Sequence, residues 1–396
     1  MRAIICGAGI AGLTLAWWLE RDGWEVELVE KAPARRDAGY MIDFAGSGYD
    51  VAERMGLLPR LRAIQTSITR VHYLDRRGRG RGWFDYQGFT AALGGRACTV
   101  MRGELERVLH DALDGRVSVR YAATIDAITQ HAGRPTVTLS DGSTAPVDLV
   151  VGADGIHSRV RALAFGPERL VQRYLGFHTA SYLFEDEAMR AQVGDRFLIV
   201  AEPDRQVGLY PIDDGRIAAW LTHRTPDPRL PADPRAALQD NYGGLGDLVD
   251  RALTHVRGVP DVYYDRVAQI EMDGWARGGV TLAGDSCQAV SLLAGQGASL
   301  AMGGAYVLAD ELRRGDPERA AARYEQRMRP FVRDKQRSGR ATARWLVPDT
   351  RWRIAARSLA FGATRMPGGT KVVGIALARA VSSVVPAGTE PAAVGR

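Results

Sequence analysis

The sequence contains little cysteine and no long uninterrupted run of hydrophobic residues. Its three cysteines are far apart and lack CxxC spacing, so neither a disulfide framework nor a metal site is predicted. The apolar stretch over residues 1–19 is interrupted by three glycines at turn-forming spacing, which argues against an export signal. A second apolar stretch, 372–385, is shorter than the roughly 20 residues that a transmembrane helix needs and contains Arg379. We therefore expect a cytoplasmic protein without a transmembrane segment.

The sequence contains enough apolar residues to form the cores of two or three domains. It has 396 residues, of which 46% are hydrophobic and 25% charged. Its net charge of +6 is unevenly distributed, because residues 313–396 carry 18 Lys and Arg against 6 Asp and Glu. A surface for nucleic acid or an anionic membrane is one interpretation, and a solvated arginine-rich helical face is the other. No aromatic-interleaved binding motif accompanies the arginines, which favours the solvated face and predicts no nucleic-acid partner.

The first thirty residues predict a βαβ unit that binds a dinucleotide. Apolar residues 2–6 form a strand, 11–21 a helix and 24–29 a second strand. Between the first strand and the helix lies a GxGxxG motif, whose first glycine permits the tight turn, whose second lets the backbone approach a pyrophosphate, and whose third allows close helix packing. An acidic residue at the end of the second strand has the spacing expected for a ribose contact. The predicted dinucleotide contacts are Gly7, Gly9, Ile10, Ala11, Gly12, Glu30 and Lys31.

The rest of the chain divides by its patterns. Residues 102–113 are predicted to be helical, and 117–121, 136–139 and 147–152 to be strands. From 176 to 224, aromatic-rich segments alternate with turn signals, which predicts an antiparallel meander. A buried strand at 279–283 and a helix at 298–313 resume the first pattern, and the remainder from residue 317 is predicted to be mostly helical.

Two later motifs distinguish between nucleotides. Residues 154–161 read DGIHSRVR, and 284–286 read GDS with LAGQG at 293–297. These resemble the DGxxSxxR and GD motifs of the class A flavoprotein monooxygenases, a family that includes para-hydroxybenzoate hydroxylase and tetracycline-inactivating monooxygenases. All three fingerprints occur in the order and spacing of that family. The resemblance spans about residues 1–313 and implies FAD as the cofactor, while no motif covers the tail.

The resemblance also implies roles for individual residues. Asp285 would hydrogen-bond the ribityl chain, and the helix that opens after 295–297 would stabilise the negative pyrimidine edge of reduced flavin. Asp154 would hold its loop near the dinucleotide, with Arg161 stabilising that turn; the alternative is an aspartate that only orders its own loop. Asp43 would lie near the flavin or would be an ordinary strand-end acid. The implied cofactor contacts are Asp43, Arg102, Asp154, Gly284, Asp285, Gly295, Gln296 and Gly297.

The sequence departs from the family at two positions beside the GD motif. The family commonly has a histidine where Gln288 stands and a proline where Leu292 stands. Gln288 cannot titrate near neutral pH, and Leu292 removes a rigid φ from the loop over the flavin. Flavin binding should survive both changes, whereas the type and efficiency of the oxygen chemistry are open. We expect Cys287 to be a small packing residue rather than a covalent flavin attachment.

The substrate is expected between the flavin and the inserted sheet, where aromatic and apolar residues concentrate. Strand alternation places Phe177 and His178 on opposite faces, as it does Thr222 and His223, so one of each pair faces the pocket. No residue is identifiable as a catalytic acid or base, since the flavin performs the chemistry. The predicted substrate contacts are His178, Tyr210, Trp220, His223, Leu292 and Leu293.

These observations predict an FAD-dependent monooxygenase that hydroxylates an aromatic or polycyclic small molecule, plausibly in secondary metabolism. The resemblance implies that O2 and NAD(P)H react through a flavin C4a-hydroperoxide, and the lack of a second GxGxxG fits NAD(P)H as a transient co-substrate. A dehydrogenase or oxidase on the same fold, or a flavin- and ligand-binding protein without turnover, are the alternatives. We expect a monomer or weak dimer.

The predicted fold class is α/β, a Rossmann-type FAD-binding domain with an inserted, mainly antiparallel substrate domain and a helical C-terminal tail. The FAD-binding domain is discontinuous and takes 1–72, 97–170 and 271–315. The substrate domain takes 73–96 and 171–270, and the helical segment takes 316–396.

Overall fold

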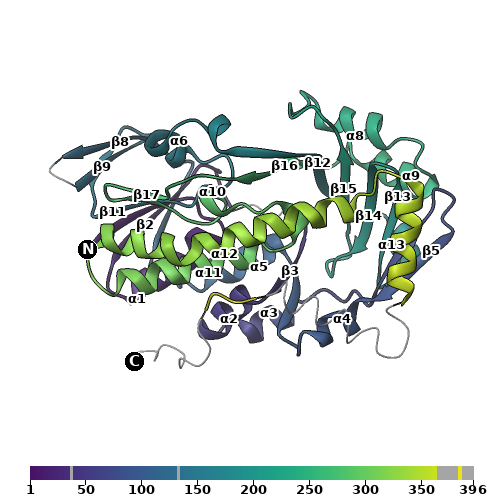
Figure 1. Ribbon diagram of the computed structural model, residues 1–396, viewed down its shortest axis with the longest axis horizontal. Helices are drawn as coiled ribbons and strands as arrows, with labels where there is room; N and C mark the ends of the chain where they lie inside the picture. Colours follow the sequence, from purple (N-terminus) through teal and green to yellow (C-terminus); the bar gives the residue numbers. More distant parts are fainter. Residues whose placement is uncertain (36–38, 132–133, 364–381, 386–396) are drawn as a thin grey trace.

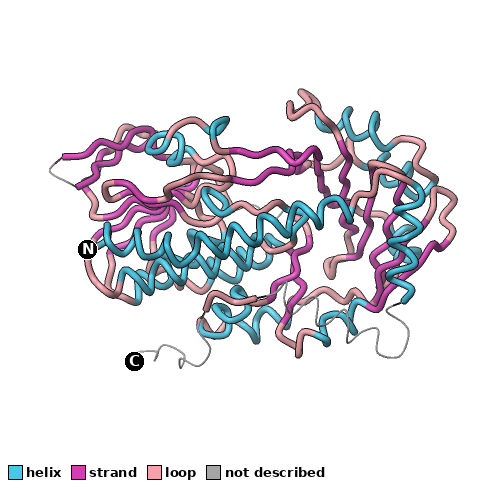
Figure 2. Tube along the Cα trace, in the orientation of Figure 1, coloured by secondary structure: helices cyan, strands magenta, loops and turns pink. Residues whose placement is uncertain are grey.

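The computed structural model describes residues 1–35, 39–131, 134–363 and 382–385, and within them two large β-sheets lie at opposite ends of an elongated molecule (Figure 1). Figure 2 shows long helices beside the first sheet and a second group of strands at the other end. The predicted α/β class with a mainly antiparallel second sheet is confirmed.

The first sheet has six strands in the order β17-β18-β11-β1-β2-β7. Its pairs are parallel except β17–β18, as expected when helices connect successive strands. The strands predicted at 2–6, 24–29, 117–121, 147–152 and 279–283 all lie in it, within two residues of their expected bounds. The strands are β1 (Arg2–Cys6), β2 (Glu25–Glu30), β7 (Ser118–Tyr121), β11 (Leu149–Gly152), β17 (Ala276–Arg277) and β18 (Val280–Leu282).

Helices and a small sheet surround this first sheet. Helix α1 packs against α11 and α5, and their apolar residues join one core with those of the sheet. A three-stranded antiparallel sheet leads from β7 to β11. The elements are α1 (Ile10–Arg21), α5 (Arg102–Asp111), α6 (Arg159–Phe165), α11 (Gly297–Leu312), β8 (Ile125–His131), β9 (Arg134–Leu139) and β10 (Thr144–Pro146).

The second sheet has seven strands in the order β16-β12-β15-β14-β13-β4-β5. Strands β13 to β15 form the predicted meander, but the prediction that β12 continues it is wrong. Helix α7 (Glu187–Val193) follows β12, and β12 pairs with β15 and β16 instead of β13. The strands are β4 (Arg70–Leu74), β5 (Gly80–Asp85), β12 (Gln172–Phe184), β13 (Arg196–Glu202), β14 (Arg205–Pro211), β15 (Ile217–Arg224) and β16 (Tyr263–Ile270).

One face of the second sheet is covered by two helices, and short elements join the two sheets. Helices α8 and α9 bury that face in a core of its own. Strands β3 and β6 form a separate two-stranded ladder between the sheets. These elements are α8 (Pro234–Tyr242), α9 (Asp247–His255), β3 (Met41–Ala45), β6 (Ala97–Met101), α2 (Ser47–Arg54), α3 (Leu58–Ala63), α4 (Tyr86–Ala92) and α10 (Asp285–Gln288), with 3₁₀ turns η1 (Glu168–Leu170) and η2 (Leu292–Ala294).

The C-terminal segment spans both sheets, as expected of a helical tail. Helix α12 (Pro317–Leu346) begins beside α11 and runs towards the second sheet (Figure 1), where α13 (Arg351–Ala363) packs on β5 and β13. Asp316 caps α12 by accepting a hydrogen bond from the backbone N–H of Arg319. The chain then returns to the first part of the molecule, since the backbone N–H of Val384 donates to Oγ of Ser47. The predictions for 364–381 and 386–396 lie outside the described residues.

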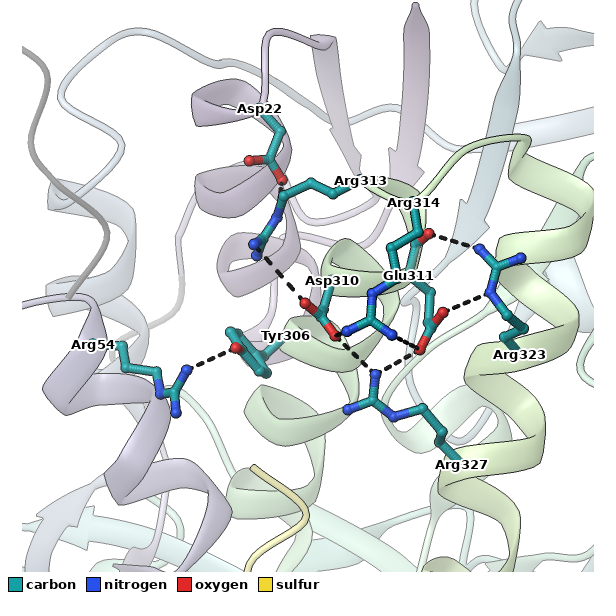
Figure 3. A network of polar contacts seen from close by, with 9 residues as sticks. All are labelled: Asp22, Arg54, Tyr306, Asp310, Glu311, Arg313, Arg314, Arg323 and Arg327. Carbon is teal, nitrogen blue, oxygen red and sulfur yellow. Dashed lines mark hydrogen bonds and ion pairs between the residues drawn. The ribbon is translucent and has the colours of Figure 1, made fainter. Parts of the chain in front are cut away.

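An ion-pair network fixes α12 to α11 (Figure 3). Glu311 is only 1% exposed and accepts from Arg323 at 2.7 Å and from Arg327 at 2.6 Å. Asp310 pairs with Arg327 and Arg314, both at 2.8 Å. Burial alone raises the pKa of Glu311, but the hydrogen bonds from Arg323 and Arg327 more than offset burial, so the pKa is lowered. The charged form of Glu311 therefore stabilises the contact between the tail and the first core.

We predict that Glu311→Ala lowers the free energy of unfolding by about 1–3 kcal/mol, because two guanidinium groups lose a buried acceptor. The exposed Glu25→Ala serves as control and should change it by less than about 0.5 kcal/mol. Because the pKa of Glu311 is lowered on folding, its contribution is present above the ordinary carboxyl pKa and is lost as pH falls through the lowered value. Denaturant titrations of both variants across acidic pH would contradict this role if Glu311→Ala matched Glu25→Ala throughout.

Candidate active site

The glycine-rich turn between β1 and α1 contains glycines of two kinds. A Cβ atom on Gly7, whose φ is +106°, would lie 2.3 Å from the carbonyl oxygen of Ala153. One on Gly12 would lie 1.9 Å from the carbonyl oxygen of Gly7. The fold itself therefore requires both glycines. A Cβ on Gly9 would meet no described atom closer than 3.5 Å, an ordinary contact distance, so the fold itself does not require Gly9.

Helix α1 begins at the GxGxxG turn and helix α11 begins after the GD motif, and neither start has a side-chain cap. Helix α1 starts at Ile10 and Ala11, and α11 starts at Gly297, after Gly295 in the left-handed conformation and Gln296. Neither helix has a side-chain cap or an acidic residue in its first turn. Their free N–H groups and positive dipole ends are suited to anionic groups of a ligand.

Four predicted residues from distant segments border one recess, which we define by Gly9, Arg102, Asp285 and Gly297. A Cβ on Gly9 would lie 3.9 Å from Nη2 of Arg102, and one on Gly297 would lie 3.8 Å from Oδ1 of Asp285. The carboxyl group of Asp285 is exposed, yet burial raises its pKa while the charge of Arg102 lowers it. The charge of Arg102 acts on the carboxyl group of Asp285, so the α5 arginine and the GD motif lie near each other. The motifs thus converge in space as the sequence predicts.

The GD motif reaches the recess because Gly284 packs directly on α1. A Cβ on Gly284, whose φ is +63°, would lie 2.6 Å from Cβ of Ala11. Arg102 is positioned at the start of α5, where its backbone N–H donates to the carbonyl oxygen of Tyr40 at 3.0 Å. Its guanidinium pairs with Glu106 one turn later, at 2.7 Å. The positive charge of Arg102 is thereby held next to the uncapped end of α1.

Two tyrosines at the recess were missed by sequence reasoning. The rings of Tyr40 and Tyr263 lie 5.7 Å apart, and Tyr263 is 37% exposed. Burial raises the pKa of Tyr40 to about 12, although the charge of Arg102 opposes this. No motif includes either tyrosine, and Tyr263 comes from β16, which pairs with Ser181 of β12. The one available sequence signal is strand alternation, which places Tyr263 and Tyr264 on opposite faces of β16.

Glu30 ties the end of β2 to the glycine turn. Its two carboxylate oxygens accept backbone N–H groups from Ala8 at 3.0 Å and from Ala32 at 2.9 Å. Each oxygen keeps a second lone pair for a ribose hydroxyl. Lys31, the next residue, is exposed beyond the strand.

Asp154 makes hydrogen bonds within its own loop. Its carboxylate accepts from Oγ of Ser158 at 2.5 Å and from the backbone N–H groups of Arg159 and Val160 at 2.6 and 3.1 Å. Arg161 is fully buried and donates to the carbonyl oxygen of Ser286 at 2.8 Å. The DGxxSxxR motif therefore holds the GD motif in place through Arg161.

Asp43 lies on β3 beside the second sheet. Tyr86 donates to its carboxylate, and Oγ1 of Thr99 donates at 3.0 Å. Burial raises its pKa despite these two hydrogen bonds, although the side chain is exposed. Asp43 is two residues from Met41 on the same strand, so both side chains lie on one side of β3, and the backbone N–H of Met41 donates to the hydroxyl of Tyr210 at 2.8 Å.

Tyr210 and Trp220 lie on the face of the second sheet that looks towards the first. The ring of Tyr210 contacts that of Phe197 edge-on at 5.0 Å. Trp220 packs both with this group and with a cluster that contains Phe177, Leu292 and Leu293. The loop after the GD motif therefore meets an aromatic wall at this face.

The prediction that His178 and His223 share a pocket with Tyr210 and Trp220 is wrong. Strand register places both histidines on the opposite face, under α8 and α9. His178 contacts the hydroxyl of Tyr264 at 3.2 Å, and His223 that of Tyr242 at 3.0 Å. They line a separate cavity of about 450 Å³. Burial lowers the pKa of His223 to about 4, so it is neutral there.

The chain is similar to known proteins over most of its length. A family model described as an FAD binding domain matches residues 1–336. A flavin-dependent monooxygenase from an unknown prokaryotic organism is 31% identical over 348 residues, 85% of this chain and 88% of the relative. The monooxygenase CTB7 of Cercospora beticola is 30% identical and covers 89% of each chain.

The chain belongs to the class A FAD-dependent monooxygenases. Among solved structures, tetracycline destructase Tet(55) has a TM-score of 0.80 at 28% identity and covers 94% of this chain and 96% of that one. HpxO of Klebsiella pneumoniae, solved with FAD and uric acid, has a TM-score of 0.76 at 26% identity and covers 96% of each chain. The monooxygenase uses FAD, and the recess fits it, because two uncapped helix ends and Arg102 suit the anionic pyrophosphate and flavin edge.

The departure of this monooxygenase from its family at Gln288 does not reach the recess. Gln288 is buried, and its Nε2 donates at 2.5 Å to the hydroxyl of Tyr324 on α12. That hydroxyl donates to the carbonyl oxygen of Leu282 at 3.1 Å. Cys287 beside it is fully buried, and burial raises its thiol pKa, which agrees with a packing role. Gln288 therefore secures the tail helix behind the GD motif.

Within the described ranges, this monooxygenase presents no group of His, Cys, Asp and Glu side chains arranged to hold a metal ion. Its helices in the same ranges include none with the length and apolarity to cross a membrane.

We predict that Gly9→Val weakens FAD binding by at least about tenfold, or about 1.4 kcal/mol, by placing a side chain where the pyrophosphate approaches. The apoprotein should remain folded, because no described atom lies within 3.5 Å of the new Cβ. Gly12→Ala is the matched comparison and should destabilise the fold itself, since its Cβ would lie 1.9 Å from the carbonyl oxygen of Gly7. FAD titration and thermal unfolding of both apoproteins separate the two effects. Equal FAD affinity of Gly9→Val and the unchanged protein would contradict the assignment.

Asp285→Ala should reduce FAD affinity by about 1–3 kcal/mol, because hydroxyl groups of the cofactor would be left without an acceptor. Asp126→Ala, on exposed β8, provides a control that also removes one carboxylate. Fluorescence titration of apoprotein with FAD measures both. An Asp285→Ala affinity as high as that of the control would show that the carboxylate does not contact the cofactor.

Proposed function

We propose that this monooxygenase hydroxylates a small aromatic or polycyclic molecule, with NAD(P)H and O2 as co-substrates, in secondary metabolism. The observation that carries the proposal is that segments next to the cofactor motifs contact an aromatic wall. Leu292 and Leu293, just before Gly295, pack with Trp220, and the backbone N–H of Met41 donates to the hydroxyl of Tyr210. Apolar walls with a few polar groups are typical of sites for hydrophobic ligands.

We assign the cofactor contacts as the sequence predicts them. The uncapped start of α1 would take the pyrophosphate, Glu30 the ribose, and Asp285 the ribityl chain. The start of α11 would face the pyrimidine edge, where its dipole stabilises negative charge. Asp154 holds its own loop through Ser158 and Arg159, and its contact to the cofactor stays a prediction. When bound, FAD would accept a hydride from NAD(P)H and activate O2 for transfer to the substrate.

The protein's own part is to orient the substrate and to exclude water. Phe177, Trp220 and Leu293 pack in one apolar cluster where the η2 loop meets the sheet. Tyr210 is fixed by the backbone of Met41, which gives the wall a set geometry. Asp43, whose pKa burial raises, lies two residues from Met41, which bonds Tyr210 of this wall. We propose it as a contact to the flavin or to a polar group of the substrate.

Relatives support the chemical class. HpxO was solved with FAD and uric acid, and Tet(55) is named a tetracycline destructase, so both are linked to small-molecule ligands. The departure at Gln288 leaves the dehydrogenase open. The side chain of Gln288 bonds Tyr324 and does not face the recess. No structural observation favours the dehydrogenase over the monooxygenase.

We expect one atom of labelled O2 to appear in the product when the FAD-loaded enzyme turns over with NAD(P)H and a panel of phenolic and polycyclic compounds. Substrate should also stimulate NAD(P)H consumption, and Trp220→Ala should raise KM for that compound more than it changes FAD affinity. The same panel added anaerobically without NAD(P)H is the control. Bleaching of the flavin by substrate alone, with product free of label, would assign the protein to the dehydrogenases instead.

A further inference from the structure

The end of the second sheet carries a cavity that the flavin chemistry does not use. The cavity, of about 900 Å³, lies between the β4–β5 hairpin and α13. Figure 1 shows α13 and β5 side by side at one end of the long axis, with β8 and β9 at the other end. We call the surface around it the arginine face, defined by Arg76, Arg77, Arg79, Arg81, Arg351, Trp352 and Leu359.

The arginine face has more positive charge than its carboxylates neutralise. Arg81 pairs with Asp75 at 3.0 Å, and Arg351 lies 3.9 Å from Glu202. The other oxygen of Asp75 accepts the backbone N–H groups of Arg77 and Arg79 and not their side chains. In the part of the chain that the structure describes, the guanidinium groups of Arg76, Arg77 and Arg79 have no ion pair. Like charges held this close repel one another, so an anionic partner would stabilise the hairpin.

The same face exposes large apolar side chains. Trp352 is 67% exposed and Leu359 is 76% exposed, and the two are seven residues apart on α13, which places them on one side of the helix. The opposite side of α13 is packed, because the ring of Phe361 stacks on that of Tyr73 at 5.3 Å and Arg357 is fully buried. Leu359 also lines the cavity, so the apolar stripe and the arginines form one surface.

We propose that the arginine face binds the surface of an anionic lipid bilayer. The arginines of the hairpin would accept phosphate headgroups in the cavity, while Trp352 and Leu359 enter the boundary between headgroups and acyl chains. Charge alone would equally suit a nucleic acid. The aliphatic side chain of Leu359 decides between them, because it gains nothing from phosphates or base edges and gains burial in lipid. The proposal does not depend on which molecule the enzyme oxidises.

The test is sedimentation of the full-length, FAD-loaded protein with vesicles of phosphatidylcholine alone or mixed with phosphatidylglycerol. We expect binding to the mixed vesicles only, with a decrease as salt concentration rises. Arg77→Gln/Arg79→Gln should weaken this binding by about 30-fold, at roughly fivefold for each arginine near an anionic surface. The matched control, Arg116→Gln/Arg134→Gln, removes the same charge at the opposite end and should change binding by less than about twofold.

A second variant separates insertion from charge. Trp352→Ser/Leu359→Ser leaves the charge unchanged and should reduce binding to the mixed vesicles, with FAD content and thermal unfolding unaltered because both side chains are exposed. Absence of vesicle binding at low salt would overturn the proposal. So would equal losses in the two arginine pairs, full binding by the serine variant, or tight binding to duplex DNA by protein that does not bind vesicles.

Discussion

The absence of side chains at three glycines determines how closely the segments of this enzyme approach one another. Gly7 lies against the backbone of Ala153, Gly12 against Gly7 itself, and Gly284 against Ala11 of the first helix. At each contact an added Cβ would lie 2.6 Å or less from a neighbouring atom. Gly7 brings the backbone after β11 against the glycine turn, and Gly284 brings the GD motif against α1. Asp285 reaches the recess only as a result of this approach.

Hydrogen bonds then hold the segments of the cofactor site that the three glycines bring together. Arg161, buried beneath the DG loop, bonds the carbonyl oxygen of Ser286 and so orients the segment that carries Asp285. Behind that segment Gln288 bonds Tyr324 of α12, and Gln336 of α12 donates to the carbonyl oxygens of Ile270 and Ala289. A buried donor or acceptor that lost its partner here would cost free energy comparable to a whole hydrogen bond. The tail is therefore part of the support of the cofactor site.

The sequence was sufficient for the cofactor side because motif spacing and parallel-strand topology place glycine turns and strand ends at one sheet edge. It was insufficient for the substrate side. Alternation showed that Phe177 and His178 face opposite ways, but the outward face is decided by α8 and α9, which follow some sixty residues later and cover the histidines. Tyr40 and Tyr263 belong to no motif and meet only in the fold. Nothing in the sequence indicates that Gln288, which stands where the family commonly has a histidine, bonds the hydroxyl of Tyr324 on α12.

The C-terminal segment explains why the sequence predicts the cofactor site better than the substrate site. The family model ends at residue 336, within α12, while Ala343 and Val347 pack with Phe177 and Leu293, and Phe361 of α13 packs with Tyr73 of the second sheet. Residues that complete the substrate-facing core thus come from beyond the shared motif-bearing region. FAD is common to the family and requires fixed geometry in that region, whereas the walls around a particular substrate need not be shared. A tail that packs on both sheets can change those walls while the cofactor recess keeps its geometry.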